Sequence, residues 1–299
     1  MQTSLTIVIL TYNSQKVIKN CLENINLDKY LVIVADNASS DDTLQIVEQN
    51  FPQVKIIKLD KNYGYGRGNN FALKLVESEF ALVLNPDAFI KDEDIELVLN
   101  AMRQDKKAAL AGCINLKNQI FDEAQYQKEL SQAKEDFQNE RSVFYEKTNE
   151  NYYANFIVGA GLFMKMSIMK TVGFFDKNIF LYYEDNEICK RTIDAGYKNL
   201  IVTKAIIMHV GSGSTNYNSR LHYKVSWHMA WSKLYFRAIK KGYSKAKRLA
   251  FRNFFRFFFK AIFSIFNKKK FILNLATSMG SLSYFLGLKA FDKNDKARG

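Results

Sequence analysis

Short apolar runs alternate with stretches of helical character through the first 112 residues, and this alternation constrains the fold more than any other feature of the sequence. The apolar runs occupy residues 5–10, 31–35, 54–59, 81–84 and 108–112. The helical stretches between them occupy residues 15–26, 41–50, 68–77 and 92–103. Strand, helix and strand at this spacing predict a parallel sheet, and continuous runs such as LTIVIL are typical of strands covered on both faces. Ligands of such sheets bind beyond the carboxyl ends of the strands.

The rest of the chain reads as an insertion, a continuation of the α/β region and a helical region. Residues 117–150 are charged and rich in glutamine, and they either cover the acceptor side of a site or form a surface excursion. The last strand-like run lies at 200–202, and beyond Arg220 the acidic residues almost disappear while the pattern becomes helical. We therefore expect an α/β domain over 1–219, interrupted by the insertion, and a helical region over 220–299.

Charge is unevenly distributed between these regions. The 299 residues carry 43 Lys and Arg against 30 Asp and Glu, a formal net charge of +13. Residues 195–299 hold 21 basic and 2 acidic residues, a net +19, which leaves 22 basic and 28 acidic residues, a net −6, for residues 1–194. An apolar share of 47% excludes a disordered chain, and only 2 prolines without a Gly/Ser-rich run exclude a long flexible linker.

Cysteine content and the N-terminal sequence indicate the cellular compartment in which the protein is expected. Cys21, Cys113 and Cys189 are neither closely spaced nor even in number, which argues against a disulfide framework or a zinc ribbon. The first apolar run is only of strand length and follows Met-Gln-Thr-Ser rather than a positive segment, so it does not resemble a signal peptide. We expect free thiols and a cytoplasmic location.

Polar residues follow the first two predicted strands. The first strand ends in Thr11-Tyr12-Asn13 and the second in Asp36-Asn37. A carboxylate and an amide at adjacent strand ends can hydrogen-bond a pyrimidine and its ribose, while backbone N–H groups approach phosphate. The alternative is that Asp36 and Asn37 start a turn and cap the helix that follows.

A glycine-rich segment, NYGYGRGNN, occupies residues 62–70. Its three alternating glycines free the backbone for close approach to a ligand, and Arg67 can meet a phosphate. The segment lacks both the GxxxxGK[ST] and the GxGxxG pattern of phosphate loops. The alternative is a glycine-rich helix start without a ligand.

The fourth strand ends in Asn85-Pro86-Asp87. Proline ends the strand, and Asp87 is then held at the sheet edge as one oxygen ligand for a divalent cation. His209, which follows a later strand, can supply an imidazole to the same metal. The alternatives are an aspartate that only forms a turn and a histidine that is only structural.

Three carboxylates lie within four positions in the segment FLYYEDNE, which begins at Phe180. If Glu184 opens a helix, Glu184 and Glu187 share a face and Asp185 projects from the first turn. A carboxylate there can act as a general base, and the helix N-terminus favours its ionised form. The alternative is an acidic helix start, which is stabilising without any catalytic role.

The order of these motifs, rather than any one of them, resembles a known family. TIVILTYNS, VADNASSDDT, NYGYGRGNN, LVLNPDA, VGAGLFMKMSIMKTVGFFD, LYYEDNEICKRTIDAGY and the following His209 are similar to the family 2 glycosyltransferases of GT-A fold, close to the rhamnosyltransferase-like branch. The resemblance covers roughly residues 4–215. It implies a Rossmann-like, mostly parallel sheet and an inverting transfer of sugar from a nucleotide-sugar donor to an acceptor hydroxyl.

The resemblance also implies roles for individual residues. On the donor side, the residues that would hold the nucleotide are Thr11, Tyr12, Asn13, Asp36, Asn37, Arg67, Asn70 and Asn85. Asp87 stands at the last position of the family's DxD motif, although Asn85-Pro86-Asp87 offers one carboxylate rather than two. Asp185, preceded by Glu184, matches the catalytic base, and His209 matches a metal ligand. The implied cofactor is Mg²⁺ or Mn²⁺.

The basic region carries a regular cationic pattern. Lys245, Arg248, Arg252, Arg256 and Lys260 form one stripe on a helix whose remainder is mostly phenylalanine and isoleucine. Such a helix is typical of a membrane interface with anionic lipid, whereas the polar residues within 271–288 make that uncharged stretch marginal as a membrane span. The alternatives are a helical bundle that packs its phenylalanines on the catalytic domain, and nucleic-acid binding, which is disfavoured because no base-reading motif is present.

Together these features predict a membrane-associated inverting glycosyltransferase, peripheral on the cytoplasmic face of the cell membrane. We expect it to move a sugar, with dTDP-rhamnose favoured as donor, to a hydroxyl of a lipid-linked or cell-surface glycan. One alternative is the same fold with a UDP-hexose or UDP-N-acetylhexosamine donor. Another is a non-catalytic, membrane-docked module that binds glycan or nucleotide.

Overall fold

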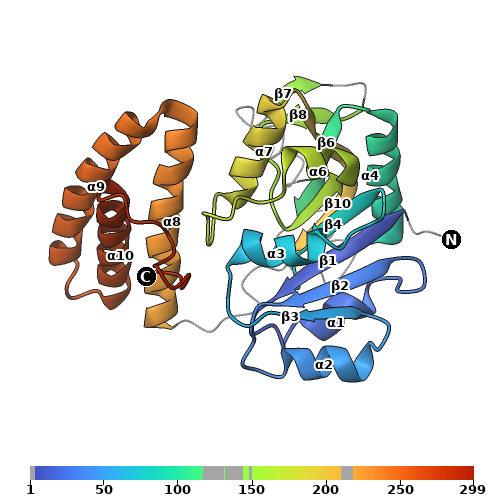
Figure 1. The fold of residues 1–299 in the computed structure, drawn as a ribbon, viewed down its shortest axis with the longest axis horizontal. Coiled ribbons are helices and arrows are strands. Elements are labelled where there is room, and N and C mark those ends of the chain that lie inside the picture. Colours follow the sequence, from blue (N-terminus) through green and yellow to red (C-terminus); the bar gives the residue numbers. More distant parts are fainter. Residues whose placement is uncertain (1–3, 117–130, 132–143, 148–149, 210–217) are drawn as a thin grey trace. The chain divides into compact units, whose positions relative to one another are not determined.

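A computed structural model describes residues 4–116, 131, 144–147, 150–209 and 218–299 (Figure 1). Most of the predicted insertion at 117–150 lies outside the described residues. The chain divides into two compact units. The first unit comprises Met1–Asn62, Gly68–Phe174 and Ile188–Thr215, and the second comprises Tyr63–Arg67, Phe175–Glu187 and Asn216–Gly299.

A mixed sheet forms the first unit. Its strands are β1 (Leu5–Thr11), β2 (Leu31–Asp36), β3 (Lys55–Lys58), β4 (Phe80–Leu84), β5 (Ala88–Ile90), β6 (Ala108–Leu116), β7 (Phe144–Lys147), β8 (Tyr152–Ala154), β9 (Gly161–Lys165) and β10 (Lys198–His209). Their order is β3-β2-β1-β4-β9-β6-β10-β8-β7, with β5 paired to β10. The β3-β2-β1-β4 block is parallel, as is the β6–β10 pair. The predicted α/β class with a mostly parallel central sheet is confirmed.

Helices connect the strands, and all of them except α6 lie close to the predicted helical stretches. They are α1 (Ile18–Glu23), α2 (Thr43–Asn50), α3 (Tyr65–Leu73), α4 (Asp92–Gln104), α6 (Met166–Val172) and α7 (Glu184–Asp194). The sequence predicted no direction for the strands beyond residue 112, and β9 runs antiparallel between β4 and β6. The residues of β9, GLFMK, carry the apolar character of a central strand but no signal of its direction.

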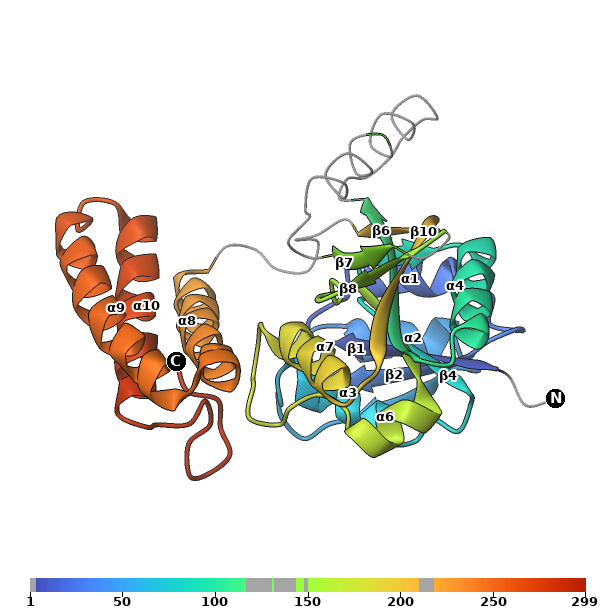
Figure 2. The same cartoon turned by 90° about the horizontal axis from the view of Figure 1, so that it is seen from above.

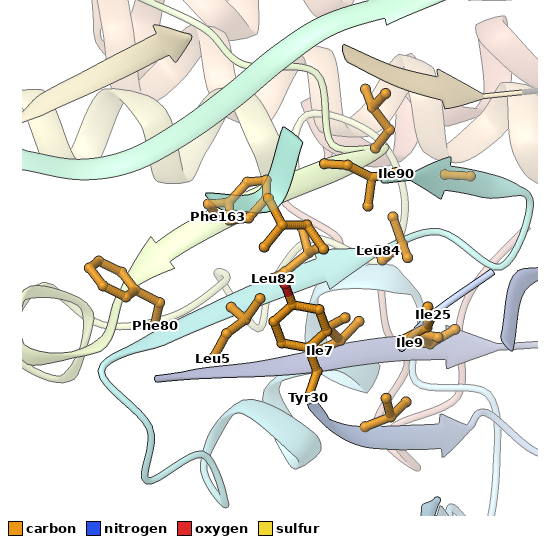
Figure 3. Close-up of a cluster of buried hydrophobic side chains, with 14 of the residues drawn as sticks. Leu5, Ile7, Ile9, Ile25, Tyr30, Phe80, Leu82, Leu84, Ile90 and Phe163 are labelled. Atoms are coloured by element: carbon orange, nitrogen blue, oxygen red, sulfur yellow. The ribbon is translucent and has the colours of Figure 1, made fainter. Parts of the chain in front are cut away.

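The central strands of this sheet are deeply buried. Every residue of β1 is buried, as a strand covered on both faces requires. Figure 3 shows Leu5, Ile7 and Ile9 of β1 with Leu82 of β4 and Phe163 of β9 in one apolar cluster. Each such side chain stabilises the fold by roughly 1.5–3 kcal/mol when it leaves water. The core therefore fixes the positions at which the strands end.

Three long helices, α8 (Ser219–Lys241), α9 (Tyr243–Phe263) and α10 (Lys268–Phe285), dominate the second unit and lie side by side in both views (Figures 1 and 2). The predicted C-terminal helical region is thus confirmed. Its core combines large aromatic residues of α8 with alanines of α9, namely Trp227, Trp231, Ala246 and Ala250. A Cβ added at Gly280 of α10 would lie 2.5 Å from the carbonyl oxygen of Trp227, so glycine allows α10 to approach α8 closely.

The length and apolarity of its helices show whether the helical region could span a membrane, and its unit also contains residues from outside the region. Among the helices that the structure describes, none combines the length and the apolarity needed to cross a bilayer. The second unit also includes two segments from within the expected catalytic domain, Tyr63–Arg67 and Phe175–Glu187. The domain boundary near residue 219 stays a prediction.

Candidate active site

The carboxyl ends of β1 and β2 bring together the first group of predicted residues. Parallel pairing places Thr11 opposite Asp36. The Thr11 hydroxyl donates to Asp36 Oδ1 at 2.8 Å, and the Asn37 backbone N–H donates to the Thr11 carbonyl oxygen at 2.8 Å. All three residues are buried at the end of the sheet, as the parallel strands predict.

Asp36 also organises the turn that follows β2. The Ser39 backbone N–H donates to Asp36 Oδ2 at 2.9 Å, and the Ser39 hydroxyl donates to Oδ1. Asn13 adopts a left-handed φ of 51°, and its backbone N–H and side-chain oxygen bond to Ser39 and Ser40. The turn-forming alternative therefore describes part of what Asp36 does. Tyr12 remains 41% exposed beside this turn.

Close packing against other residues of the chain accounts for the glycines of the 62–70 segment. Gly64 has a φ of +80°, and a Cβ there would lie 2.1 Å from the carbonyl oxygen of Phe180. A Cβ at Gly66 would lie 2.7 Å from the Cβ of Phe175. Tyr65 begins α3, and its N–H donates to the Phe180 carbonyl oxygen at 2.9 Å. The helix-start interpretation thus explains the glycines without a ligand.

Arg67, on the first turn of α3, is held by a residue that the sequence did not single out. Its Nη1 and Nη2 donate to the two carboxylate oxygens of Asp295 at 2.8 and 2.9 Å. Asn70 lies on the same helix and is half-buried. No local pattern marks Asp295, because 228 positions separate it from Arg67.

Strand pairing brings Asp87 and His209 together. β5 follows the Asn85-Pro86-Asp87 turn and pairs with β10, which places His209 opposite Ala88. His209 Nε2 lies 3.2 Å from Asp87 Oδ1 and 3.4 Å from Asn85 Nδ2. The sequence predicted that Asp87 and His209 would share a site, and the structure places these two side chains in contact.

Cys21 packs beneath the same turn. Its thiol points at the carbonyl oxygens of Asn85 and Ala88, at 3.8 and 3.6 Å. Burial, with a smaller contribution from the Asp87 carboxylate, raises the pKa of the Cys21 thiol to about 12. The thiol is therefore protonated at neutral pH and supports the turn instead of reacting.

The two predicted acidic residues at the start of α7 differ in environment. Glu184 is 7% exposed, and its Oε2 is buried without a hydrogen-bond partner among the described residues. Burial, and after it the Asp185 carboxylate, raises the pKa of the Glu184 carboxyl from its ordinary 4.5 to about 8. Asp185 is only half-buried, and its Oδ1 accepts the Asn186 backbone N–H at 2.8 Å. Asp185 is the more accessible of the two.

The segment before α7 is strained and braced by α8. Tyr182 and Tyr183 both adopt left-handed φ values, 64° and 69°, which non-glycine residues rarely do. The Ser232 hydroxyl of α8 donates to the Leu181 carbonyl oxygen at 3.0 Å, and the Tyr235 hydroxyl donates to Asp176 at 2.8 Å. Sequence reasoning missed both of these supports, because a hydroxyl in a long helix carries no signal of its distant partner.

The family model for glycosyl transferase family 2 matches residues 6–173, which is more than half of the chain. The chain belongs to glycosyltransferase family 2. It is 30% identical over 212 residues to the rhamnosyltransferase WbbL of Escherichia coli K12, covering 64% of this chain and 78% of that protein. It is 23% identical over 248 residues to an N-acetylglucosaminyl-diphospho-decaprenol L-rhamnosyltransferase of Mycobacterium tuberculosis, covering 74% and 81%.

Solved structures show the same fold. A mannosyltransferase of Pyrobaculum calidifontis, in complex with GDP-Man and Mn²⁺, matches with a TM-score of 0.56 and 15% identity over 96% of this chain and 88% of that chain. TarS of Staphylococcus aureus matches with a TM-score of 0.51 and 20% identity over 77% and 39%. The predicted GT-A fold and the resemblance to the rhamnosyltransferase-like branch are confirmed, and the protein is a glycosyltransferase. The match of the family model ends before Asp185 and His209, whose roles stay predictions.

The donor set at Asp87 and His209 suits a hard divalent cation in this glycosyltransferase. Neighbouring ligands of an octahedral cation lie about 3 Å apart, and Asp87 Oδ1 and His209 Nε2 are 3.2 Å apart. Among the described residues, no group of three or more His, Cys, Asp or Glu side chains is placed to hold a metal. Asp87 and His209 could supply one carboxylate oxygen and one imidazole nitrogen to a divalent cation, whose other ligands would be water and phosphate oxygens.

Proposed function

We propose that this glycosyltransferase moves rhamnose from dTDP-rhamnose, with inversion, to a hydroxyl of a lipid-linked or cell-surface glycan. The observation that carries the proposal is the similarity to two rhamnosyltransferases over most of their length. The name of the mycobacterial relative specifies a decaprenol-linked acceptor, which supports a lipid-linked glycan here. A UDP-hexose or UDP-N-acetylhexosamine donor is the alternative, because TarS, a poly(ribitol-phosphate) N-acetylglucosaminyltransferase, is also a relative.

On the donor side, the ends of β1 and β2 bind the nucleotide. Asp36 Oδ2 accepts one backbone N–H, which leaves it acceptor capacity for a ribose hydroxyl. Thr11, Asn13 and Asn37 define the shape of the nucleoside site, and Tyr12 offers it an exposed ring. Arg67, together with Asn70 and Asn85, lines the side of the diphosphate. Asp87 and His209 would hold a divalent cation, Mg²⁺ or Mn²⁺, which when bound would supply positive charge to offset the charge on the leaving diphosphate.

On the acceptor side, Asp185 is the general base. Its carboxylate accepts the proton of the acceptor hydroxyl while that oxygen attacks the anomeric carbon from the face opposite the diphosphate. The bond from the anomeric carbon to the diphosphate oxygen breaks, and the nucleoside diphosphate leaves with its electron pair. Glu184, which burial keeps protonated near neutral pH, does not compete for the proton. Hydrogen bonds from α8 hold the stretch Phe175–Glu187, here called the base segment, in place.

Asp185→Asn tests this mechanism. The amide keeps the shape of the side chain but cannot accept the proton, so we expect turnover to fall about 10²–10⁴-fold while nucleotide affinity is unchanged. Transfer assays and thermal stabilisation by dTDP, UDP and GDP, with and without Mn²⁺, measure both quantities and rank the donors.

Asp194→Asn is the matched control, because Asp194 ends the same helix and is ion-paired with Lys190 at the surface. An Asp185→Asn enzyme with normal turnover would defeat the role of base. A wild-type chain that neither transfers sugar nor hydrolyses any donor would instead favour a non-catalytic binding module.

We also propose that the second unit docks this enzyme on an anionic membrane surface, at the cytoplasmic face where a lipid-linked acceptor would be presented. All five residues of the predicted cationic stripe lie on α9 and are exposed. Four apolar residues where α9 ends and the chain turns toward α10, here called the apolar tip, are exposed by 50–102%: Ile262, Phe263, Ile265 and Phe266. Lys268, Lys269 and Lys270 follow the tip at once.

The packing inside the second unit favours this docking. The bundle uses alanines of α9 for its contacts, so the phenylalanines at the end of α9 do not contribute to the core of their own unit. Basic residues beside exposed aromatic rings are the combination that binds an anionic bilayer interface. Recovery with anionic vesicles in a flotation gradient tests the association.

A further inference from the structure

Residues 290–299 form a small hairpin within the second unit. Phe291 and Ala297 form a β-bridge, and the Asp292 N–H donates to the Lys296 carbonyl oxygen at 2.8 Å. The Asp292 side chain accepts the backbone N–H groups of Asn294 and Lys296, each at 2.9 Å. These bonds give the hairpin a defined turn.

The hairpin packs on the segment that precedes Glu184. Phe291 is buried, and its ring meets Phe180 edge-on with centroids 5.8 Å apart. The Phe180 carbonyl oxygen in turn accepts the N–H of Tyr65. The hairpin, the base segment and the stretch Tyr63–Arg67 are therefore packed together within the second unit.

Arg67 is fixed by this assembly from several directions. Asp295 accepts both Nη groups, while the rings of Tyr63 and Phe291 lie 4.9 and 4.7 Å from the guanidinium carbon. A bidentate carboxylate sets the plane of the guanidinium, and the two rings add cation–π attraction. The Arg67 side chain is 19% exposed, and its further N–H groups can still donate to an anion.

We propose that Asp295 is a positioning residue that holds Arg67 in the orientation in which it meets the diphosphate of the donor. The inference rests on the donor-side role of Arg67 in the proposed function. An arginine on a flexible side chain loses rotational freedom when it binds phosphate, and a pre-formed carboxylate pair removes most of that cost before the donor arrives. Asp295 lies far from the family motifs and acts only through Arg67.

Asp295→Asn tests the positioning role because asparagine removes the negative charge and keeps nearly the same side-chain shape. Asp295 has a left-handed φ of 58°, which asparagine adopts readily, so the backbone is not strained by the change. Asp292→Asn is the matched control, since it makes the same charge change three positions away and keeps a side-chain oxygen for the two backbone N–H groups. Neither change is expected to unfold the chain, and melting curves check this.

We expect Asp295→Asn to raise the donor KM, and the Kd of the nucleoside diphosphate, about tenfold, which is the usual effect of losing one hydrogen-bonded charge. The kcat should stay within about twofold, since Asp295 does not touch the reacting atoms. Asp292→Asn should leave the KM, the kcat and the Kd unchanged. In the Arg67→Ala background, Asp295→Asn should have no further effect on the KM, because both changes remove the same interaction.

Three outcomes decide against the inference. A donor KM in Asp295→Asn equal to that of Asp292→Asn overturns the positioning role and leaves the proposed function intact. A lower KM shows that Asp295 competes with the diphosphate for Arg67, which also overturns it. If the wild-type chain binds no nucleoside diphosphate at all, the donor-side role of Arg67 is wrong, and the positioning role and the proposed function fail together.

Discussion

At the scale of single residues, adjacent carboxyl groups at the start of α7 have different chemistry. Glu184 is buried with one oxygen unpartnered among the described residues, whereas Asp185 is half-buried. Burial, and after it the Asp185 carboxylate, raises the pKa of Glu184 to about 8, so the Glu184 carboxyl is mostly protonated near neutral pH. In the mechanism that we propose, Asp185 rather than Glu184 removes the acceptor proton.

Glu184→Gln should make the stability of the protein less dependent on pH. The pKa of Glu184 is raised on folding from 4.5 to about 8, so the folded state binds more protons and the free energy of unfolding falls as pH rises between these values. Glutamine removes this effect. We expect a gain of about 1–3 kcal/mol at pH 9 and almost none near pH 4, measured by denaturant unfolding.

The control for this prediction is Asp194→Asn, which removes an exposed carboxylate from the same helix. It should change the free energy of unfolding only slightly, because exposed ion pairs contribute about 0–1 kcal/mol. If the Glu184→Gln and wild-type free energies run parallel from pH 4 to pH 9, the Glu184 carboxyl is not protonated by burial.

At the scale of elements, the short strand β5 determines whether Asp87 and His209 can act together. β5 pairs antiparallel with the end of β10 and brings His209 within 3.2 Å of Asp87. The proline of the preceding turn and the buried Cys21 beneath it hold Asp87 at this point. The pair exists because of a strand pairing between residues that are far apart in the sequence.

His209→Ala should weaken the contribution of metal to nucleotide binding. With one protein ligand lost, we expect the gain in dTDP affinity on adding Mn²⁺ to shrink about tenfold, while affinity without Mn²⁺ is unchanged. Titration calorimetry with and without Mn²⁺ measures the difference. His222→Ala, on α8, is the control for loss of an imidazole. An undiminished effect of Mn²⁺ in His209→Ala would exclude His209 as a ligand.

Local pattern predicted most of the fold and part of the site. Continuous apolar runs marked β1, β2 and β4, and the polar residues that follow Thr11 and Asp36 marked their ends, because both signals lie within a few positions. The direction of β9 depends on its neighbours in the sheet, which no window of sequence contains. Asp295 was missed for the same reason, since its partner Arg67 is 228 positions away.

At the scale of the whole molecule, charge separates along the chain. Residues 195–291 contain no acidic residue, and the two acidic residues that follow, Asp292 and Asp295, both lie in the 290–299 hairpin. The exposed stripe of α9 and the apolar tip belong to this basic part. The excess positive charge is therefore concentrated in the part of the chain that we propose docks on a lipid surface.

Phe263→Ser with Phe266→Ser should weaken vesicle binding about tenfold or more, since each aromatic ring loses apolar burial in the bilayer interface. The exposures of 87% and 102% predict little effect on stability. The full chain should float with anionic vesicles, less with zwitterionic vesicles, and less at high salt.

The double variant Leu75→Ser with Leu97→Ser is the control. Both leucines belong to the first unit, and their exposed fractions are 48% and 40%. It should float like the wild-type chain. Wild-type protein that stays in the soluble fraction with every vesicle would rule out the membrane proposal.

The second unit is assembled from separate stretches of the chain, which limits where this enzyme can be cut or joined to a relative. Three separate stretches of sequence, Tyr63–Arg67, Phe175–Glu187 and Asn216–Gly299, fold as one body. A single cut near residue 219 would leave the base segment without Ser232 and Tyr235, its partners on α8. A chimaera made to exchange this unit between relatives must therefore transplant all three stretches together, because a C-terminal region grafted alone would lack Tyr63–Arg67 and Phe175–Glu187.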